Sequence, residues 1–158
     1  MISQRCSSRS ILAMIAIVLV CGGCAHVPDV DRHFKLHNAY ETVRYFRYAI
    51  DAGQYGAAYR CLSPESQQQI SKLAFEAMLR FVDVPELGGI GLKNLLVDST
   101  VDSHVEVVNS GQPQKWVTLI WSCDDQLIEY SLMVSPGSSK RWQIDLLSVR
   151  GIDLQGTS

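Results

Sequence analysis

The first residues with reactive side chains are two cysteines near the start of the chain. Cys21 and Cys24 enclose two glycines, and a cysteine thiolate is a nucleophile that can be modified covalently. They follow ten apolar residues, Ile11–Val20, and a start that contains Arg5 and Arg9 but no acidic residue. A bilayer span needs about 20 apolar residues, so this run is too short for one. The combination predicts a leader segment that brings a modifiable thiol to a membrane surface.

This segment resembles a bacterial lipoprotein signal peptide, which implies a signal-peptide helix within residues 1–23 and lipidation of Cys24. Two glycines precede Cys24, whereas the bulkier Leu19 and Val20 precede Cys21, so we expect processing at Cys24. The family pattern usually has an aliphatic residue three positions before the lipidated cysteine, where this chain has Cys21. In known lipoproteins the thiol receives a diacylglycerol and the new amino group often an acyl chain such as palmitate. Two or three chains give stable membrane attachment.

The resemblance implies an address on the extracytoplasmic side of the cell envelope. An Asp after the lipidated cysteine favours the inner membrane in many diderm bacteria, and here Ala25 follows Cys24. We therefore expect the outer membrane if the organism is diderm. Two alternatives stay open: a secretory signal cleaved elsewhere, and an uncleaved N-terminal anchor.

The chain after the leader has the length of one domain. Its formal net charge is −4, because the whole chain carries −2 and the leader removes Arg5 and Arg9. A mildly acidic domain argues against nucleic acid or anionic lipid as its main partner. Cys61 and Cys123 remain once Cys24 is lipidated. They either form a disulfide in an oxidising compartment or stay as two buried free thiols.

Helices are expected in the first half of the domain. Asn38 is a typical N-cap with Glu41 three residues later, and it begins a helix that ends at Gly53. A short helix is expected over residues 54–62. Ser63 then caps an apolar stripe that reaches residue 82, with a break near Ser71 left open.

Strands are expected in the second half, because the apolar period changes to two from about Leu95. After this first stretch the pattern predicts strands over residues 116–123, 127–135 and 141–149, with turns between them. Helices followed by a meander indicate the α+β class, with N-terminal helices packed on an antiparallel sheet of about four strands.

Three stretches together resemble the NTF2-like (cystatin-like cone) superfamily. Tyr40–Tyr55 is an aromatic-rich helix that ends in Asp-Ala-Gly-Gln-Tyr, Ala57–Glu65 contains Ala-Tyr-x-x-Leu-Ser-Pro, and Lys140–Asp145 has a Trp before an Ile. The resemblance implies a curved sheet around a long helix with a cone-shaped pocket. It divides the chain into a leader (1–23), a tether (24–37), an NTF2-like domain (38–150) and a tail (151–158). Members of the superfamily include isomerases, dehydratases, transport factors and lipid-anchored proteins without known catalysis.

An enzyme of the isomerase or dehydratase type would need an acid or base near a tyrosine in an apolar pocket. The candidates on predicted strands are Asp98, His104, Glu129 and Asp145, and those on predicted helices are Tyr45, Tyr48, Tyr55 and Tyr59. Alternation along the strands places most of these acids and the histidine opposite the apolar positions. The tyrosines either line an amphipathic pocket or are core and rim aromatics. His33 and His37 share a spacing of four but have no evident third metal ligand. We therefore assign no catalytic, cofactor-binding or metal-ligating residue.

The sequence favours a lipid-anchored binding or interaction module without catalysis, located outside the cytoplasm. Its expected partners are the membrane and either a small apolar ligand or a protein. Trp116 and Ile120, opposite in parity to Val117 and Leu119, suggest a second apolar sheet face and a homodimer. The alternative function is a small enzyme that uses the cone pocket.

Overall fold

A computed structural model describes residues 35–84, 89–107 and 113–151, the residues 103–107 by their backbone alone. The leader (1–23), the tether before residue 35, His33 and the tail after residue 151 lie outside the described residues. Within these ranges, no helix combines the length and apolar character needed to cross a membrane. The expected α+β class is confirmed, with helices first and a four-stranded antiparallel sheet after them.

The helical half begins with α3 (Ala39–Asp51), α4 (Tyr55–Tyr59), α5 (Pro64–Gln69) and α6 (Lys72–Phe81). Side-chain caps hold the starts of α3, α5 and α6, and those at Asn38 and Ser63 were predicted from the sequence. The Asn38 side chain accepts a hydrogen bond from the Glu41 N–H at 2.7 Å, and Ser63 and Ser71 accept equivalent bonds at α5 and α6. A helix break therefore occurs at Ser71, between α5 and α6.

One expected strand start is wrong. The segment that includes Leu95 and Asp98 is not extended but forms α7 (Leu92–Asp98), which follows the small β1 (Asp83–Val84) and β2 (Ile90–Gly91) pair. Leu92, Leu95 and Leu96 are all buried, and spacings of three and one place them on one side of a helix. The β3 strand (Thr100–Val107) begins only after this helix.

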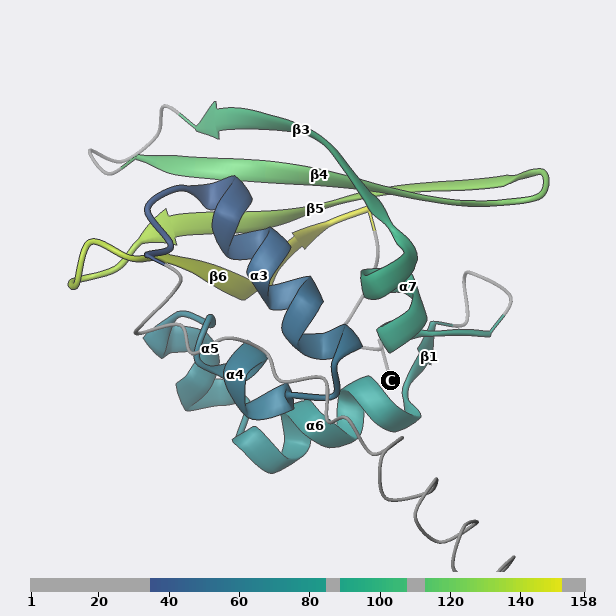
Figure 1. Ribbon diagram of the computed structural model, residues 1–158, viewed down its shortest axis with the longest axis horizontal. Helices are drawn as coiled ribbons and strands as arrows, with labels where there is room; N and C mark the ends of the chain where they lie inside the picture. The colour runs from purple at the N-terminus through teal and green to yellow at the C-terminus, as the bar shows by residue number, and fades with distance from the viewer. Residues whose placement is uncertain (1–34, 85–88, 108–112, 152–158) are drawn as a thin grey trace, which may run out of the picture.

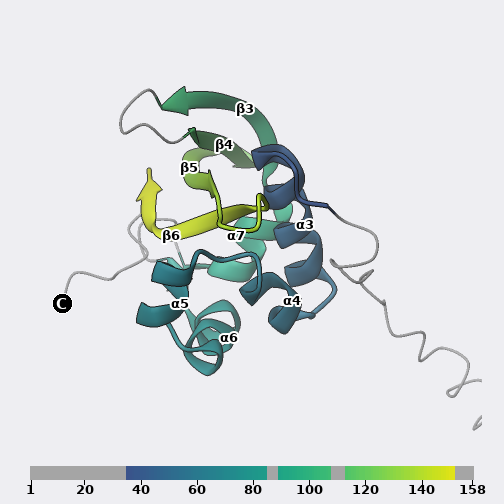
Figure 2. The ribbon, with the colours of Figure 1, turned by 90° about the vertical axis from the view of Figure 1, so that its left-hand side faces the viewer.

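The sheet is a meander in the order β3-β4-β5-β6, with β4 (Gln114–Cys123), β5 (Gln126–Pro136) and β6 (Trp142–Arg150). Figure 1 shows its strands side by side, and Figure 2 shows α3 against one face. Buried apolar pairs lie opposite each other in the register: Leu119 with Tyr130, Val117 with Leu132, and Val134 with Ile144. Alternation thus gives the sheet its core face, as predicted.

The outer edge of β6 is paired with the helical half. The backbone N–H of Trp142 donates to Leu36 O at 2.9 Å, that of Ile144 to Cys61 O at 2.8 Å, and that of Leu146 to the Ser66 hydroxyl at 3.0 Å. The Ser63 N–H donates to Ile144 O at 2.8 Å. We call these bonds to Trp142, Ile144 and Leu146 the β6 seam. The seam covers an edge that would otherwise leave its backbone groups unpaired.

A bulge in β6 lies beside this seam. Leu132 pairs with Val149 and the next residue, Met133, pairs with Asp145, so β6 carries extra residues at this point. The Asp145 carboxylate accepts hydrogen bonds from the Leu147 N–H at 3.0 Å and the Ser148 hydroxyl at 2.6 Å. A bulge bends its strand, and β6 turns sharply in Figure 2.

Arg47 joins α3 to the end of α7. Its guanidinium donates to Leu96 O and Val97 O, both at 2.6 Å, and to Ser99 O. These carbonyls lie at a helix C-terminus, where a cation is favoured by unsatisfied carbonyls and the helix dipole. Burial lowers the pKa of Arg47, and the Tyr130, Tyr40 and Asp98 groups act against this effect. Arg47 therefore fixes α7 to the long helix that covers the sheet.

Replacing Arg47 with Ala is expected to lower the free energy of unfolding by about 2–3 kcal/mol, because three carbonyls lose their donor. Chemical denaturation monitored by circular dichroism measures this change. Arg44→Ala is the matched control: Arg44 is exposed on the same helix, so its loss should cost less than about 0.5 kcal/mol. Equal effects of the two substitutions would contradict the role of Arg47.

Candidate functional site

The side chains between α3 and the sheet, where the family resemblance implies a cone pocket, are buried. Tyr45, Phe46 and Ile50 from α3 and Tyr130 and Leu132 from β5 are each at most 1% exposed. They belong to one continuous core. These residues therefore contribute to the hydrophobic core.

The polar groups within this core are hydroxyls. The Tyr130 hydroxyl lies 3.0 Å from Ser99 Oγ and 3.3 Å from Leu95 O. Burial raises the pKa of Tyr130 to about 12, while the Ser99 hydrogen bond and the Arg47 charge act to lower it. The buried polar side chains of the described part, tyrosines aside, are all Ser or Thr: Thr42, Ser63, Ser66, Ser99 and Thr118.

The structure separates the acids that the sequence singled out. Asp98 and Glu129 are exposed, and Asp145 is half-buried at the β6 bulge. His104 lies on β3, with its side chain outside the description. In the described part, no carboxylate thus shares a buried pocket with a tyrosine hydroxyl.

The helical tyrosines also divide among different surroundings. Tyr45 is buried and Tyr48 is 54% exposed. The Tyr59 hydroxyl lies 2.9 Å from Ile70 O, and the Tyr55 ring stacks under Arg80 at 5.2 Å. They do not line one pocket, so their reading as core and rim aromatics describes the structure better.

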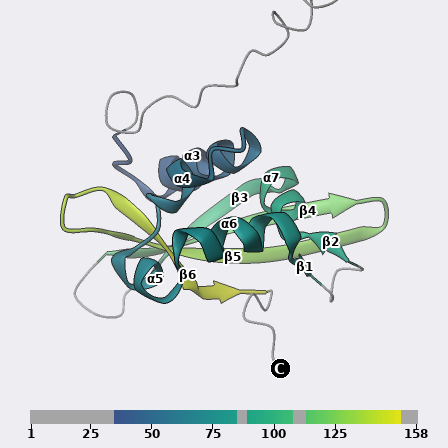
Figure 3. The same ribbon diagram turned by 90° about the horizontal axis from the view of Figure 1, so that it is seen from below.

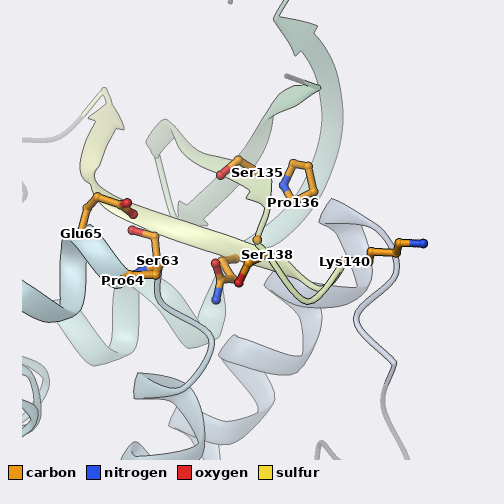
Figure 4. A pocket seen from close by; sticks show the side chains of 9 residues that line it. Ser63, Pro64, Glu65, Ser135, Pro136, Ser138 and Lys140 are labelled. Carbon is orange, nitrogen blue, oxygen red and sulfur yellow. The ribbon is translucent and has the colours of Figure 1, made fainter. Parts of the chain in front are cut away.

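A cleft of about 580 Å³ lies between the start of α5 and the β5–β6 turn. Figure 4 shows the two walls that its labelled side chains form. One wall comes from the start of α5 and the other from the turn; together they comprise Ser63, Pro64, Glu65, Ser135, Pro136, Gly137, Ser138, Lys140 and Gln143. Two prolines add apolar surface to a lining of hydroxyls, an amide and charges of both signs. Such a lining suits a small polar ligand or a polar peptide segment rather than the apolar ligand expected from sequence.

A network of hydroxyls and a carboxylate supports the floor of this cleft. Ser63 Oγ donates to Ser66 Oγ at 3.1 Å, and Ser66 Oγ donates to Asp145 Oδ1 at 3.2 Å. Ser66 Oγ also accepts from the Leu146 N–H at 3.0 Å. A serine hydroxyl has one hydrogen and two lone pairs, so Ser66 is saturated. The hydrogen of Ser63 is likewise committed, and neither hydroxyl is prepared as a nucleophile.

Sequence reasoning missed this cleft, although it identified both of its walls as separate local features. Ser63-Pro64-Glu65 was expected to start a helix, and residues 136–139 were expected to form a turn. Neither pattern shows that they face each other, because β6 places them together through the seam.

The two cysteines of the domain are unbonded, so the structure does not contain the disulfide weighed from sequence. Cys61 is a buried thiol that donates to Ala57 O at 3.5 Å, whereas Cys123 is exposed at the end of β4. In Figure 1 the β4–β5 hairpin end lies far from the α4–α5 region, which explains their separation. Burial raises the pKa of Cys61 to about 12. The sequence alternative of two buried free thiols therefore holds for Cys61 but not for Cys123, which is exposed.

In the described ranges, no group of three or more His, Cys, Asp or Glu side chains is placed to hold a metal ion.

No family model matches the chain, and no curated protein or solved structure is significantly similar to it.

The cysteine assignment is tested by alkylating the full chain with iodoacetamide, without reductant, and mapping peptides by mass spectrometry. At neutral pH, Cys61 should react at least about 100-fold more slowly than Cys123, because it is buried and its thiolate is disfavoured. In denaturant both should react. A Cys61–Cys123 peptide that resists alkylation until reductant is added would overturn the assignment.

Removing the Ser66 hydroxyl should destabilise the join between α5 and β6. Ser66→Ala leaves the Leu146 N–H without its acceptor and removes one of the three donors to the Asp145 carboxylate. We therefore expect a loss of about 1–3 kcal/mol in unfolding free energy. Ser139→Ala, in the exposed β5–β6 turn, should change it by less than about 0.5 kcal/mol. Urea titration of both variants measures the difference, and indistinguishable midpoints would refute the role of Ser66.

Proposed function

We propose that this protein is a lipid-anchored binding module on the extracytoplasmic side of the cell envelope. The observation that carries the proposal is the start of the chain: Arg5 and Arg9, a ten-residue apolar run, and two glycines directly before Cys24. A lipidated Cys24 would hold the domain at the membrane, in the outer membrane of a diderm organism. The domain would then act within reach of the bilayer surface.

The arrangement of the elements supports an NTF2-like domain in this proposal. A long helix, α3, precedes short helices and lies against a meander whose last strand is bent by a bulge. A curved antiparallel sheet around a long helix is the architecture that the sequence resemblance implies. Figure 3 shows α3 and α4 on the same side of this sheet.

The chemistry of the interior supports binding over catalysis as the role of this module. Of the acids singled out from the sequence, Asp98 and Glu129 are exposed and Asp145 accepts from a backbone N–H. The Ser63 and Ser66 hydroxyls are engaged in structural hydrogen bonds. The cleft between α5 and the β5–β6 turn has free polar surface at Glu65, Ser138 and Gln143. We propose it as the ligand or peptide contact.

A homodimer through the second sheet face stays a prediction. Trp116 is only 8% exposed, and the Arg150 guanidinium lies 4.0 Å from its ring centroid. A cation over an indole is a favourable contact that covers apolar surface. This face therefore presents less bare apolar surface than the strand parity alone suggests.

The lipid anchor is tested by growing cells with an alkyne-bearing palmitate analogue and following its incorporation into the full chain. Cys24→Ser should reduce labelling to background and move the protein out of the detergent phase, because no thiol remains to carry the diacylglycerol. Cys21→Ser is the control and should keep both the label and the partition. Unchanged processing and membrane retention in Cys24→Ser would refute the proposal.

A further inference from the structure

The helix α6 presents apolar residues on two opposite sides. Phe75 and Leu79 are buried in the core, at 0% and 2% exposure. Leu73 and Phe81 are each 78% exposed, and Ala77 between them is also exposed. Residues four apart lie on the same side of a helix. We call Leu73, Ala77 and Phe81 the α6 stripe.

The α6 stripe belongs to an outer layer of the molecule. Figures 1 and 2 show α6 beyond the β6 edge, at the opposite end of the fold from β3. Its neighbours are α4, α7 and β2, which pack against its inner side. Two large apolar side chains left in water on one short helix are unfavourable, so a surface that covers them would gain free energy.

The charges on α6 suit the polar boundary of a bilayer. Lys72 and Arg80 are exposed near its two ends. Arg80 pairs with Glu76 at 2.7 Å and lies over the Tyr55 ring, and the Lys72 ammonium lies beside Gly56 of α4. Long basic side chains extend past apolar neighbours to place their charge among headgroups. An exposed apolar stripe on a helix that also carries basic side chains is one arrangement found in helices that lie in a membrane interface.

The reach of the chain allows this contact. Residues 25–34 connect Cys24 to the first described residue, Lys35, and ten extended residues span at most about 35 Å. That length is comparable to the diameter of a small domain. A lipid at Cys24 would therefore allow α6 to reach the bilayer surface.

A second copy of the chain is a poorer occupant of the same surface. The ten residues of α6 give a helix about 15 Å long, and a stable protein interface buries about 800 Å² on each partner. Three side chains on this helix cover only a small part of such an area. A bilayer needs much less, because the lipid anchor already supplies the affinity and the stripe only has to orient the domain.

We propose that the α6 stripe rests on the lipid bilayer to which Cys24 is anchored, with Leu73 and Phe81 inserted among the acyl chains. This inference rests on the proposed lipid anchoring. It gives the domain a fixed orientation: α6 faces the membrane, and the free edge of the sheet at β3 faces away from it.

The experiment uses the processed full chain in phosphatidylcholine vesicles, with Cys123→Ser to remove the exposed thiol. A nitroxide is attached at Ala77→Cys on the stripe, or at Glu129→Cys, exposed on β5, as the matched control. Collision rates with oxygen, which concentrates in lipid, and with a water-soluble nickel chelate are measured. We expect the oxygen-to-nickel ratio at position 77 to be at least about threefold higher than at position 129.

Adding Leu73→Gln and Phe81→Gln should reduce the ratio at position 77 to that of the control, without loss of flotation with the vesicles. Equal ratios at positions 77 and 129 in vesicle-bound protein would overturn the orientation but leave the anchor standing. A chain that fails to float with vesicles would overturn the anchor, and the orientation with it. An unchanged thermal unfolding midpoint in the glutamine variant shows that its fold is intact.

Discussion

The outer edge of β6 is the constraint on which the rest of the fold depends. An edge strand exposes backbone groups at every second residue, and here Trp142, Ile144 and Leu146 meet three separate segments of the helical half. These segments are Leu36 in the approach to α3, the connection after α4 and the first turn of α5. Each hydrogen bond at the seam thus fixes one helix relative to the sheet. The α3 helix can then lie across the core face while α4, α5 and α6 pack beyond the edge.

The outer edge of β6 also determines which hydrogen bonds Ser63, Ser66 and Asp145 form. Asp145 has the acidic side chain that seemed available for chemistry, but the β6 bulge leaves backbone N–H groups that need acceptors. Its carboxylate takes one of them, and Ser66 takes another. The Ser63–Ser66–Asp145 network therefore couples α5 to β6 and shapes the floor of the cleft. A polar cluster that is fully hydrogen-bonded in this way provides rigidity rather than a reactive group.

The two surfaces for which we propose a function lie around this rigid frame. The cleft opens between α5 and the β5–β6 turn, and the α6 stripe lies on the outer helical layer. If a lipid at Cys24 holds the domain near a bilayer, these two surfaces have different roles: one contacts the membrane and the other stays open to a ligand or peptide. The seam ties both to the same strand, directly through α5 and indirectly through the helices that support α6.

The sequence by itself determined the features that depend on neighbouring residues. The caps at Asn38 and Ser63 and the alternation in β4, β5 and β6 are local, since a side chain bonds its own helix start and a strand repeats every two residues. The α7 helix was missed because its few apolar residues fit either period in so short a segment.

Only the tertiary structure decided the features that join distant residues. Ser66 and Asp145 meet across 79 positions, and Arg47 reaches the end of α7 some fifty residues later. Arg150 covers Trp116, and the unbonded cysteines lie in separate parts of the fold. No local pattern records such contacts, because they arise when the sheet edge and the helices pair in space. The proposed lipidation of Cys24 depends on its flanking residues alone, whereas the cleft and the roles of the buried polar groups required the fold.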